Sequence, residues 1–154
     1  MRWPRTLALC SALGFFELFA ATSASAACTF SSTVAVSFPV YDVFSTTDDD
    51  GTGAFTIGCT SSTSAMISLS AGGGGSFFPR TMAGPAGSVL NYNLYSDGGR
   101  TTVWGDGTGG SASLSGSFGA GIPSTFTVYA RIFRNQRGVA AGLYSDSIMV
   151  TVAP

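Results

Sequence analysis

The feature that most constrains the fold is a repeated alternation of apolar and polar residues between clusters of glycine, serine and aspartate. Alternation of period two is typical of strands with one buried face, and after residue 26 no window repeats apolar residues at helical spacing. The chain is therefore predicted to be all-β. The strands expected from the alternation cover residues 34–38, 55–59, 67–71, 90–94, 126–132 and 147–152, with a short piece at 101–104.

Six or seven short strands separated by turn signals predict a β-sandwich, because each one-sided sheet must cover its apolar face with another sheet. A closed barrel is the alternative. Clusters such as residues 72–75 and 97–99 supply the glycine and aspartate that tight turns favour. No repeat, linker or change of composition divides residues 27–154, which are predicted to form one domain.

Residues 1–26 have the pattern of an export signal. Two arginines precede an apolar stretch at residues 7–21, and the small residues Ala24 and Ala26 suit the −3 and −1 positions of a cleavage site. The apolar stretch is too short for a membrane-spanning helix. The mature chain is therefore predicted to begin at Ala27, to be exported and to have no membrane span.

The charged residues exclude several classes of function. Residues 27–154 contain five Arg and seven Asp, but no Lys, His or Glu. So sparse a positive charge argues against binding to nucleic acid or to an anionic membrane, since both need clustered cations. The absence of His and Glu removes the usual general acids and bases. The chain is predicted to be neither an enzyme nor a protein that needs a cofactor.

Three local motifs have a functional and a structural interpretation. Residues 48–50 are three adjacent aspartates, which suggest calcium but lack the alternate ligand spacing and final Glu of an EF-hand, so a solvated loop is favoured. The glycine-rich residues 105–110 lack the lysine of a phosphate loop and are interpreted as a turn. Aromatic side chains that could stack on sugars, but are expected to lie in the sandwich, are Tyr92, Tyr95, Trp104, Tyr129 and Tyr144.

The cysteines indicate an oxidising compartment. Cys10 lies in the predicted signal, which leaves Cys28 and Cys59 as an even pair in an exported chain. Such a pair predicts one structural disulfide. A redox role is disfavoured because there is no Cys-x-x-Cys spacing and no nearby cation to lower a thiol pKa.

Specific segments resemble the spore coat protein U domain family. The resemblance extends from Cys28 to about residue 152, and Cys28 and Cys59 match the positions of the family's cysteine pair. The matching segments, in chain order, are residues 80–82 (Arg-Thr-Met), 90–97, 100–110, 127–132 and 142–146.

The resemblance implies a secreted bacterial protein related to the subunits of archaic chaperone-usher pili, which act in adhesion and biofilm formation. Such subunits are immunoglobulin-like sandwiches without their last strand. The open groove is filled first by a periplasmic pilus chaperone. After the subunit is passed to the outer-membrane usher, a strand of a neighbouring subunit fills the groove instead. On this basis Ile148, Val150 and Val152 are expected to face the groove edge. Only Ala27 would precede Cys28 after cleavage, so the subunit is expected to accept a strand without donating one, at the tip or as a cap.

Three alternatives remain open. Within the family, the protein could be a spore coat or extracellular matrix component outside any pilus. Outside it, a secreted carbohydrate-binding module would use Trp104 and the tyrosines. A secreted hydrolase would need an acid and a base drawn from aspartates alone.

The predicted cleavage site can be tested directly. N-terminal sequencing of the exported protein is expected to begin at Ala27, and Ala26→Phe is expected to leave the precursor uncut, because signal cleavage requires a small residue at −1. Ser25→Phe, between the −3 and −1 positions, is the control and should still be cut. Detection of the uncut precursor outside the cell in the wild type would contradict the prediction.

Overall fold

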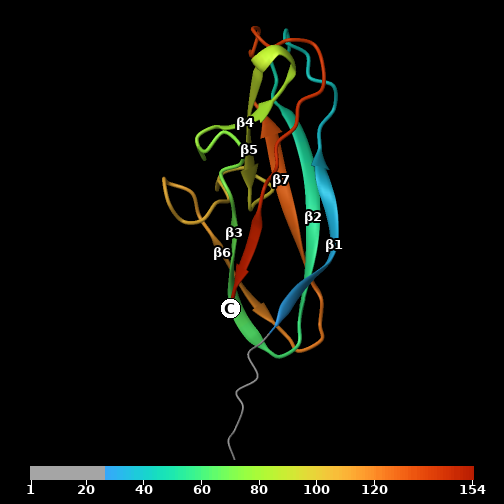
Figure 1. The fold of residues 1–154 in the computed structure, drawn as a ribbon, viewed down its shortest axis with the longest axis vertical. Coiled ribbons are helices and arrows are strands. Elements are labelled where there is room, and N and C mark those ends of the chain that lie inside the picture. Colours follow the sequence, from blue (N-terminus) through green and yellow to red (C-terminus); the bar gives the residue numbers. More distant parts are fainter. Residues whose placement is uncertain (1–26) are drawn as a thin grey trace, which may run out of the picture.

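The computed structural model describes residues 27–154, which form two β-sheets packed face to face (Figure 1). One single-turn 3-10 helix, Pro85–Gly87, interrupts the strands. No helix within these residues has the length and apolar character needed to cross a membrane. The strands are β1 (Cys28–Ser37), β2 (Asp49–Cys59), β3 (Thr63–Leu69), β4 (Arg80–Ala83), β5 (Val89–Tyr95), β6 (Leu114–Phe118), β7 (Ser124–Ile132) and β8 (Val150–Ala153).

The topology is that of a sandwich and excludes the barrel. One sheet has the strand order β1-β2-β7-β5-β4, and the other has the order β6-β3-β8. All pairs of neighbouring strands are antiparallel. The predicted all-β, immunoglobulin-like architecture is therefore confirmed.

The core follows the alternation in the sequence. In β2 the side chains of Phe55, Ile57 and Cys59 are buried, while the residues between them are partly exposed. Trp104, which is 1% exposed, lies between the sheets and donates its indole N–H to the Ile67 carbonyl at 3.1 Å. The other large members of the core are Ile67, Leu69, Met82, Leu90, Tyr92, Leu94, Phe118, Val128 and Ile132.

Three strand assignments from the sequence differ from the structure. The piece at residues 101–104 is no strand: it forms one isolated bridge to β5, from Val103 to Tyr95, and the Trp104 N–H bonds to the Leu94 carbonyl at 2.9 Å. The alternation predicts neither β4 nor β6. β4 has only four residues and begins with Arg80, and β6 has glycine at its centre, so neither shows a clear pattern.

The last strand is shorter than the predicted range of 147–152. Ser145 forms a bridge to Ala83 of β4, in the five-stranded sheet, while Val150 pairs with Leu69 of β3, in the other sheet. The chain crosses from one sheet to the other between these points. Ile148 lies in this crossing and not in the β8 ladder.

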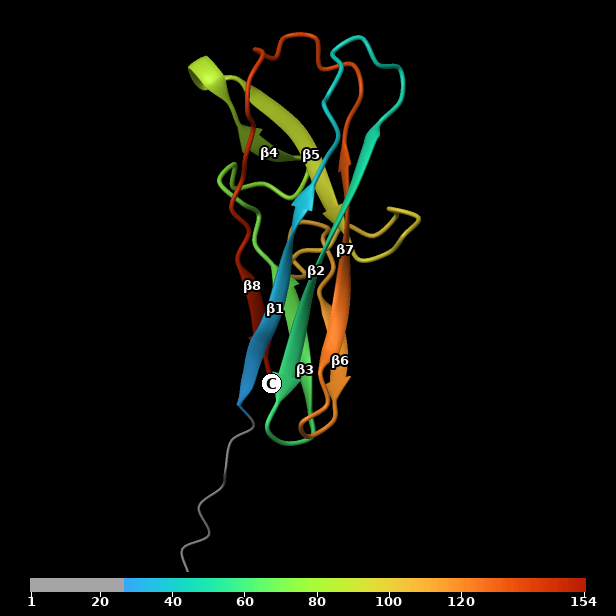
Figure 2. The ribbon, with the colours of Figure 1, turned by 90° about the vertical axis from the view of Figure 1, so that its right-hand side faces the viewer.

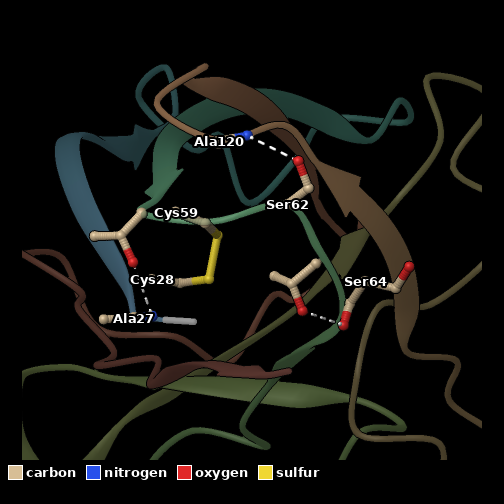
Figure 3. Close-up of a disulfide and its surroundings, with 8 residues drawn as sticks. Ala27, Cys28, Cys59, Ser62, Ser64 and Ala120 are labelled. Carbon is tan, nitrogen blue, oxygen red and sulfur yellow. Dashed lines mark hydrogen bonds between the residues drawn. A yellow bond between two sulfur atoms is a disulfide. The ribbon is translucent and has the colours of Figure 1, made fainter. Parts of the chain in front are cut away.

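A disulfide joins Cys28, the first residue of β1, to Cys59, the last residue of β2, which is the pair that the sequence predicts. Figure 3 shows it beside the turn that carries Ala120, whose N–H donates to Ser62 Oγ at 3.3 Å. The disulfide therefore fixes β1 to β2 at the end of the sandwich that also holds the C-terminus (Figure 2).

Removal of this disulfide is expected to lower stability without changing the fold. Closing a loop of 31 residues contributes about 3 to 4 kcal/mol on the chain-entropy account. Cys28→Ser together with Cys59→Ser should lower the unfolding free energy by that amount in urea titrations. Thr29→Ser with Thr60→Ser is the matched control beside the same positions. Two free thiols in the non-reduced exported protein would contradict the assignment.

Candidate strand-acceptor groove

The sandwich is open along one side. β1 and β8 are the outermost strands of their sheets, and in Figure 2 both lie on the left-hand side. Among residues 27–154, β1 pairs only with β2 and β8 pairs only with β3. We call the opening between β1 and β8 the groove.

Apolar side chains along the groove are only partly covered. They pack against the buried core but keep part of their surface exposed, unlike the side chains between the centres of the sheets. They come from β1 and the loop after it, and from the C-terminal segment: Val36, Phe38, Tyr41, Val139, Tyr144, Ile148, Val150 and Val152.

A large cavity occupies the end of the groove away from the disulfide. Its volume is about 980 Å³. Residues 35–44 form one wall and residues 139–146 with Ile148 form the other, while the floor consists of core residues such as Leu69, Leu94 and Ile132. The cavity therefore reaches the interior between the two sheets.

The backbone of β8 presents unpaired groups to the groove. The Ser70 N–H donates to the Met149 carbonyl at 2.9 Å, so these two residues form a hydrogen-bonded pair. In an antiparallel ladder the bonded side alternates, so Val150 and Val152 direct their N–H and C=O groups away from β3. The Leu69 N–H, opposite Val150, accordingly bonds on its other side to the Gly105 carbonyl at 3.2 Å.

The segment that forms the second wall is fastened at several points. Tyr144 donates its hydroxyl to the Ala140 carbonyl at 2.7 Å and contacts Ser88 Oγ at 2.8 Å. Asp146 accepts the Tyr92 hydroxyl at 2.7 Å and the Gly73 N–H at 2.8 Å. Burial, together with the hydrogen bond to Asp146, raises the pKa of the Tyr92 phenol far above its ordinary value. Tyr92 therefore remains a donor at any physiological pH.

Arg80 fixes the turn next to the start of β8. Its side chain is fully buried, and burial lowers its pKa from the ordinary value. No ion pair found within residues 27–154 includes it. Instead it donates to the Ser70 carbonyl at 2.8 and 3.1 Å, the Trp104 carbonyl at 2.7 Å and Asn93 Oδ1 at 2.9 Å. Because the Ser70 carbonyl is engaged, the Met149 N–H bonds to Ser70 Oγ at 2.9 Å.

Of the three aspartates at residues 48–50, Asp48 and Asp50 take part in ion pairs of the sheet surface. Arg131 binds Asp50 at 2.8 Å and lies 3.7 Å from Asp48, while Arg100 lies 3.2 Å from Asp50. The hydrogen bond to Arg131 lowers the pKa of Asp50. Within the described part of the chain no group of three His, Cys, Asp or Glu residues has a metal-holding arrangement. Asp48 and Asp50 thus serve as ion-pair partners of arginines on the sheet.

The aromatic residues considered for sugar stacking are largely occupied. Trp104, Tyr92 and Tyr95 are buried, and Tyr144 is bonded within the wall of the groove. Tyr129 is partly exposed, and the Arg100 guanidinium lies 5.8 Å from its ring centre. The structure therefore offers no open aromatic platform built from Trp104.

Of the residues expected at the groove edge, Ile148 lines the cavity, while Val150 and Val152 lie in β8 and pack half-buried against the core. Sequence reasoning missed the opposite wall. Its signal was a set of apolar residues, Phe38, Val40, Tyr41, Val43 and Phe44, in a loop that should otherwise be polar. The sequence analysis treated Arg80 only as part of a family motif, because nothing in the sequence around a single arginine indicates that its side chain is buried.

Comparisons with known proteins agree with this architecture. The model of the Spore Coat Protein U domain matches residues 15–151. Protein U from Myxococcus xanthus is 32% identical over 109 residues, which are 66% of this chain and 59% of Protein U. Neither description names an enzyme.

A solved structure shows the same fold. It is the CsuC–CsuE chaperone–tip adhesion subunit pre-assembly complex from the archaic chaperone-usher Csu pili of Acinetobacter baumannii. A chain of that complex superposes with a TM-score of 0.61 at 18% identity, covering 84% of this chain and 40% of that chain. The present chain thus spans less than two thirds of the length of either relative.

Loss of the Arg80 side chain is expected to destabilise the fold strongly. Arg80→Met would leave the Ser70 and Trp104 carbonyls without a donor in the interior and would remove one of the two donors to Asn93 Oδ1, at a cost of about 3 kcal/mol or more. Urea unfolding measures this loss. Arg137→Met, at an exposed arginine, should change stability by about 0.5 kcal/mol or less. Equal effects of the two substitutions would contradict the role given to Arg80.

Proposed function

The chain belongs to the Spore Coat Protein U domain family, and we propose that it is an exported, non-enzymatic structural protein whose groove accepts a β-strand from another polypeptide. The observation that carries the proposal is the edge of β8, where unpaired backbone groups and half-buried valine side chains face the same opening. An added strand would satisfy both at once.

The groove has the dimensions and character for such a strand. From the bridge at Ser145 to Ala153 the C-terminal segment beside the groove is nine residues long, which is roughly 30 Å at about 3.3 Å per residue. Over the C-terminal part of this segment, the free backbone edge of β8 can form hydrogen bonds with an added strand. The 980 Å³ cavity supports the burial of large apolar side chains over the N-terminal part.

We further propose that the strand comes from the assembly machinery and the subunits of an archaic chaperone-usher pilus. The proposed partners are a periplasmic chaperone, the outer-membrane usher and a neighbouring subunit. The fold shared with a chain of the Csu chaperone–tip adhesion subunit complex supports this assignment. If cleavage occurs before Ala27, the exported chain accepts a strand at the tip or as a cap of the fibre and takes part in adhesion.

A second candidate is a spore coat or matrix protein that assembles outside a pilus. The 32% identity to Protein U favours it. The groove would then receive a strand from another coat protein. Co-expression with a periplasmic chaperone distinguishes the two, because only the pilus assignment requires a stable chaperone complex before secretion.

Strand acceptance is expected to protect particular amides. A synthetic peptide of about ten residues with alternating valines should slow hydrogen exchange at Val150 and Val152, whose N–H groups face the groove. The Thr151 N–H, directed at β3, serves as the internal reference and should change less. Unchanged exchange at all three amides under saturating peptide would contradict the proposal.

Substitutions on the two faces of β8 should affect peptide affinity to different degrees. Val150→Asp places a charge among apolar side chains and is expected to weaken peptide binding at least about ten-fold. Thr151→Asp changes the neighbouring, exposed residue and should leave binding within about two-fold. Fluorescence anisotropy of a labelled peptide measures both. Equal affinity of the two variants would place the strand elsewhere.

A further inference from the structure

The charged residues that line the cavity are all acidic. Asp42 and Asp146 are part of its lining, and none of the lining residues is a lysine or an arginine. The walls are otherwise mainly apolar. An apolar surface of low dielectric strengthens the field of the carboxylates that it surrounds.

The two carboxylates differ in how far the protein satisfies them. Asp146 is engaged on both oxygens, by Tyr92 on one and by the backbone of Gly73 and Ser147 on the other. Asp42 is exposed, and its carboxylate accepts a local hydrogen bond from the Phe44 N–H at 2.9 Å. The ion pairs within residues 27–154 do not include it.

A third carboxylate adds to the negative charge at this place. Asp49 begins β2, pairs with the cavity-lining residue Ile132 and has the same inward parity as Phe55 and Ile57. Its Oδ2 is buried without a hydrogen-bond partner. Burial raises its pKa, and the nearby charge of Asp42 raises it further. Arg100 and Arg131 form ion pairs with Asp48 and Asp50 and with neither Asp42 nor Asp49, so the negative charge of these two carboxylates is not neutralised within residues 27–154.

A strand that fills the groove changes the surroundings of these groups. It displaces water from the cavity, and a carboxylate that loses water without gaining a partner is destabilised. A cationic side chain on the incoming strand offsets that cost, as in an ion pair at the rim of an interface. The loop between β1 and β2, which contains Asp42, lies at the end of the sandwich opposite the C-terminus (Figure 2).

We infer that the strand accepted by this groove carries, beside its alternating apolar residues, a lysine or arginine that pairs with Asp42 at the cavity end. This inference rests on the proposed strand acceptance and specifies the chemistry of the partner. The basic residue would come from the partner chain, because residues 27–154 contain no lysine and their arginines lie outside the cavity lining.

Three peptides with the same valine alternation test the inference. One carries arginine at its first position, one carries arginine at its last position, and the third has glutamine at both. Both orientations are needed because a strand can add to an edge in either direction. One arginine peptide should bind about three-fold to five-fold more tightly than the glutamine peptide, and the advantage should shrink at high salt.

Asp42→Asn is the decisive variant, because asparagine keeps an acceptor for the Phe44 N–H while removing the charge. It should abolish the preference for arginine and leave the affinity for the glutamine peptide unchanged. Asp97→Asn, in an exposed turn outside the cavity lining, is the matched control and should retain the preference.

The outcomes separate this inference from the proposal beneath it. Binding of all peptides with equal affinity, or a preference for arginine that survives in Asp42→Asn, overturns the inference and leaves strand acceptance intact. Failure of every peptide to bind, with no protection of the Val150 amide, overturns strand acceptance and the inference with it.

Discussion

The buried guanidinium of Arg80 joins three parts of the chain that lie far apart in the sequence. It binds the carbonyls of Ser70 and Trp104 and the side chain of Asn93, so it connects the end of β3, the turn after the core tryptophan and the centre of β5. Five donors in a planar fork suit this task, and no other side chain supplies them. It also affects the start of β8: Arg80 occupies the Ser70 carbonyl, so Met149 bonds to the Ser70 hydroxyl through its N–H and to the Ser70 N–H through its carbonyl.

The two edges of β8 differ in their hydrogen bonding. The side of β8 that faces β3 is paired, while the other side keeps its backbone groups and valines directed at the groove. A sandwich with one side open in this way covers its core incompletely. The fastening of the second wall by Tyr144 and Asp146 and the disulfide at the far end help to hold such a structure together before any strand arrives.

The sequence predicts the central strands well because each has one face in the core. Phe126 to Ile132 and Phe55 to Cys59 are read correctly from alternation alone. It predicts β4, β6 and the crossing before β8 poorly, since these depend on tertiary contacts such as the Ser145 bridge to Ala83. Alternation of apolar and polar residues predicts Val150 and Val152 as it predicts β7. The cavity lies between two loops that are far apart in the sequence, and no local pattern indicates that they come together.

The direction of β8 has a mechanical consequence. β8 runs along the long axis of the sandwich, toward the end that carries the disulfide (Figure 1). A strand bound beside it would share that axis. Tension applied along the axis would load the hydrogen bonds of the joint together, in shear, whereas tension applied across it would open them one at a time. The joint would therefore resist pulling along the length of the molecule far better than peeling from its side.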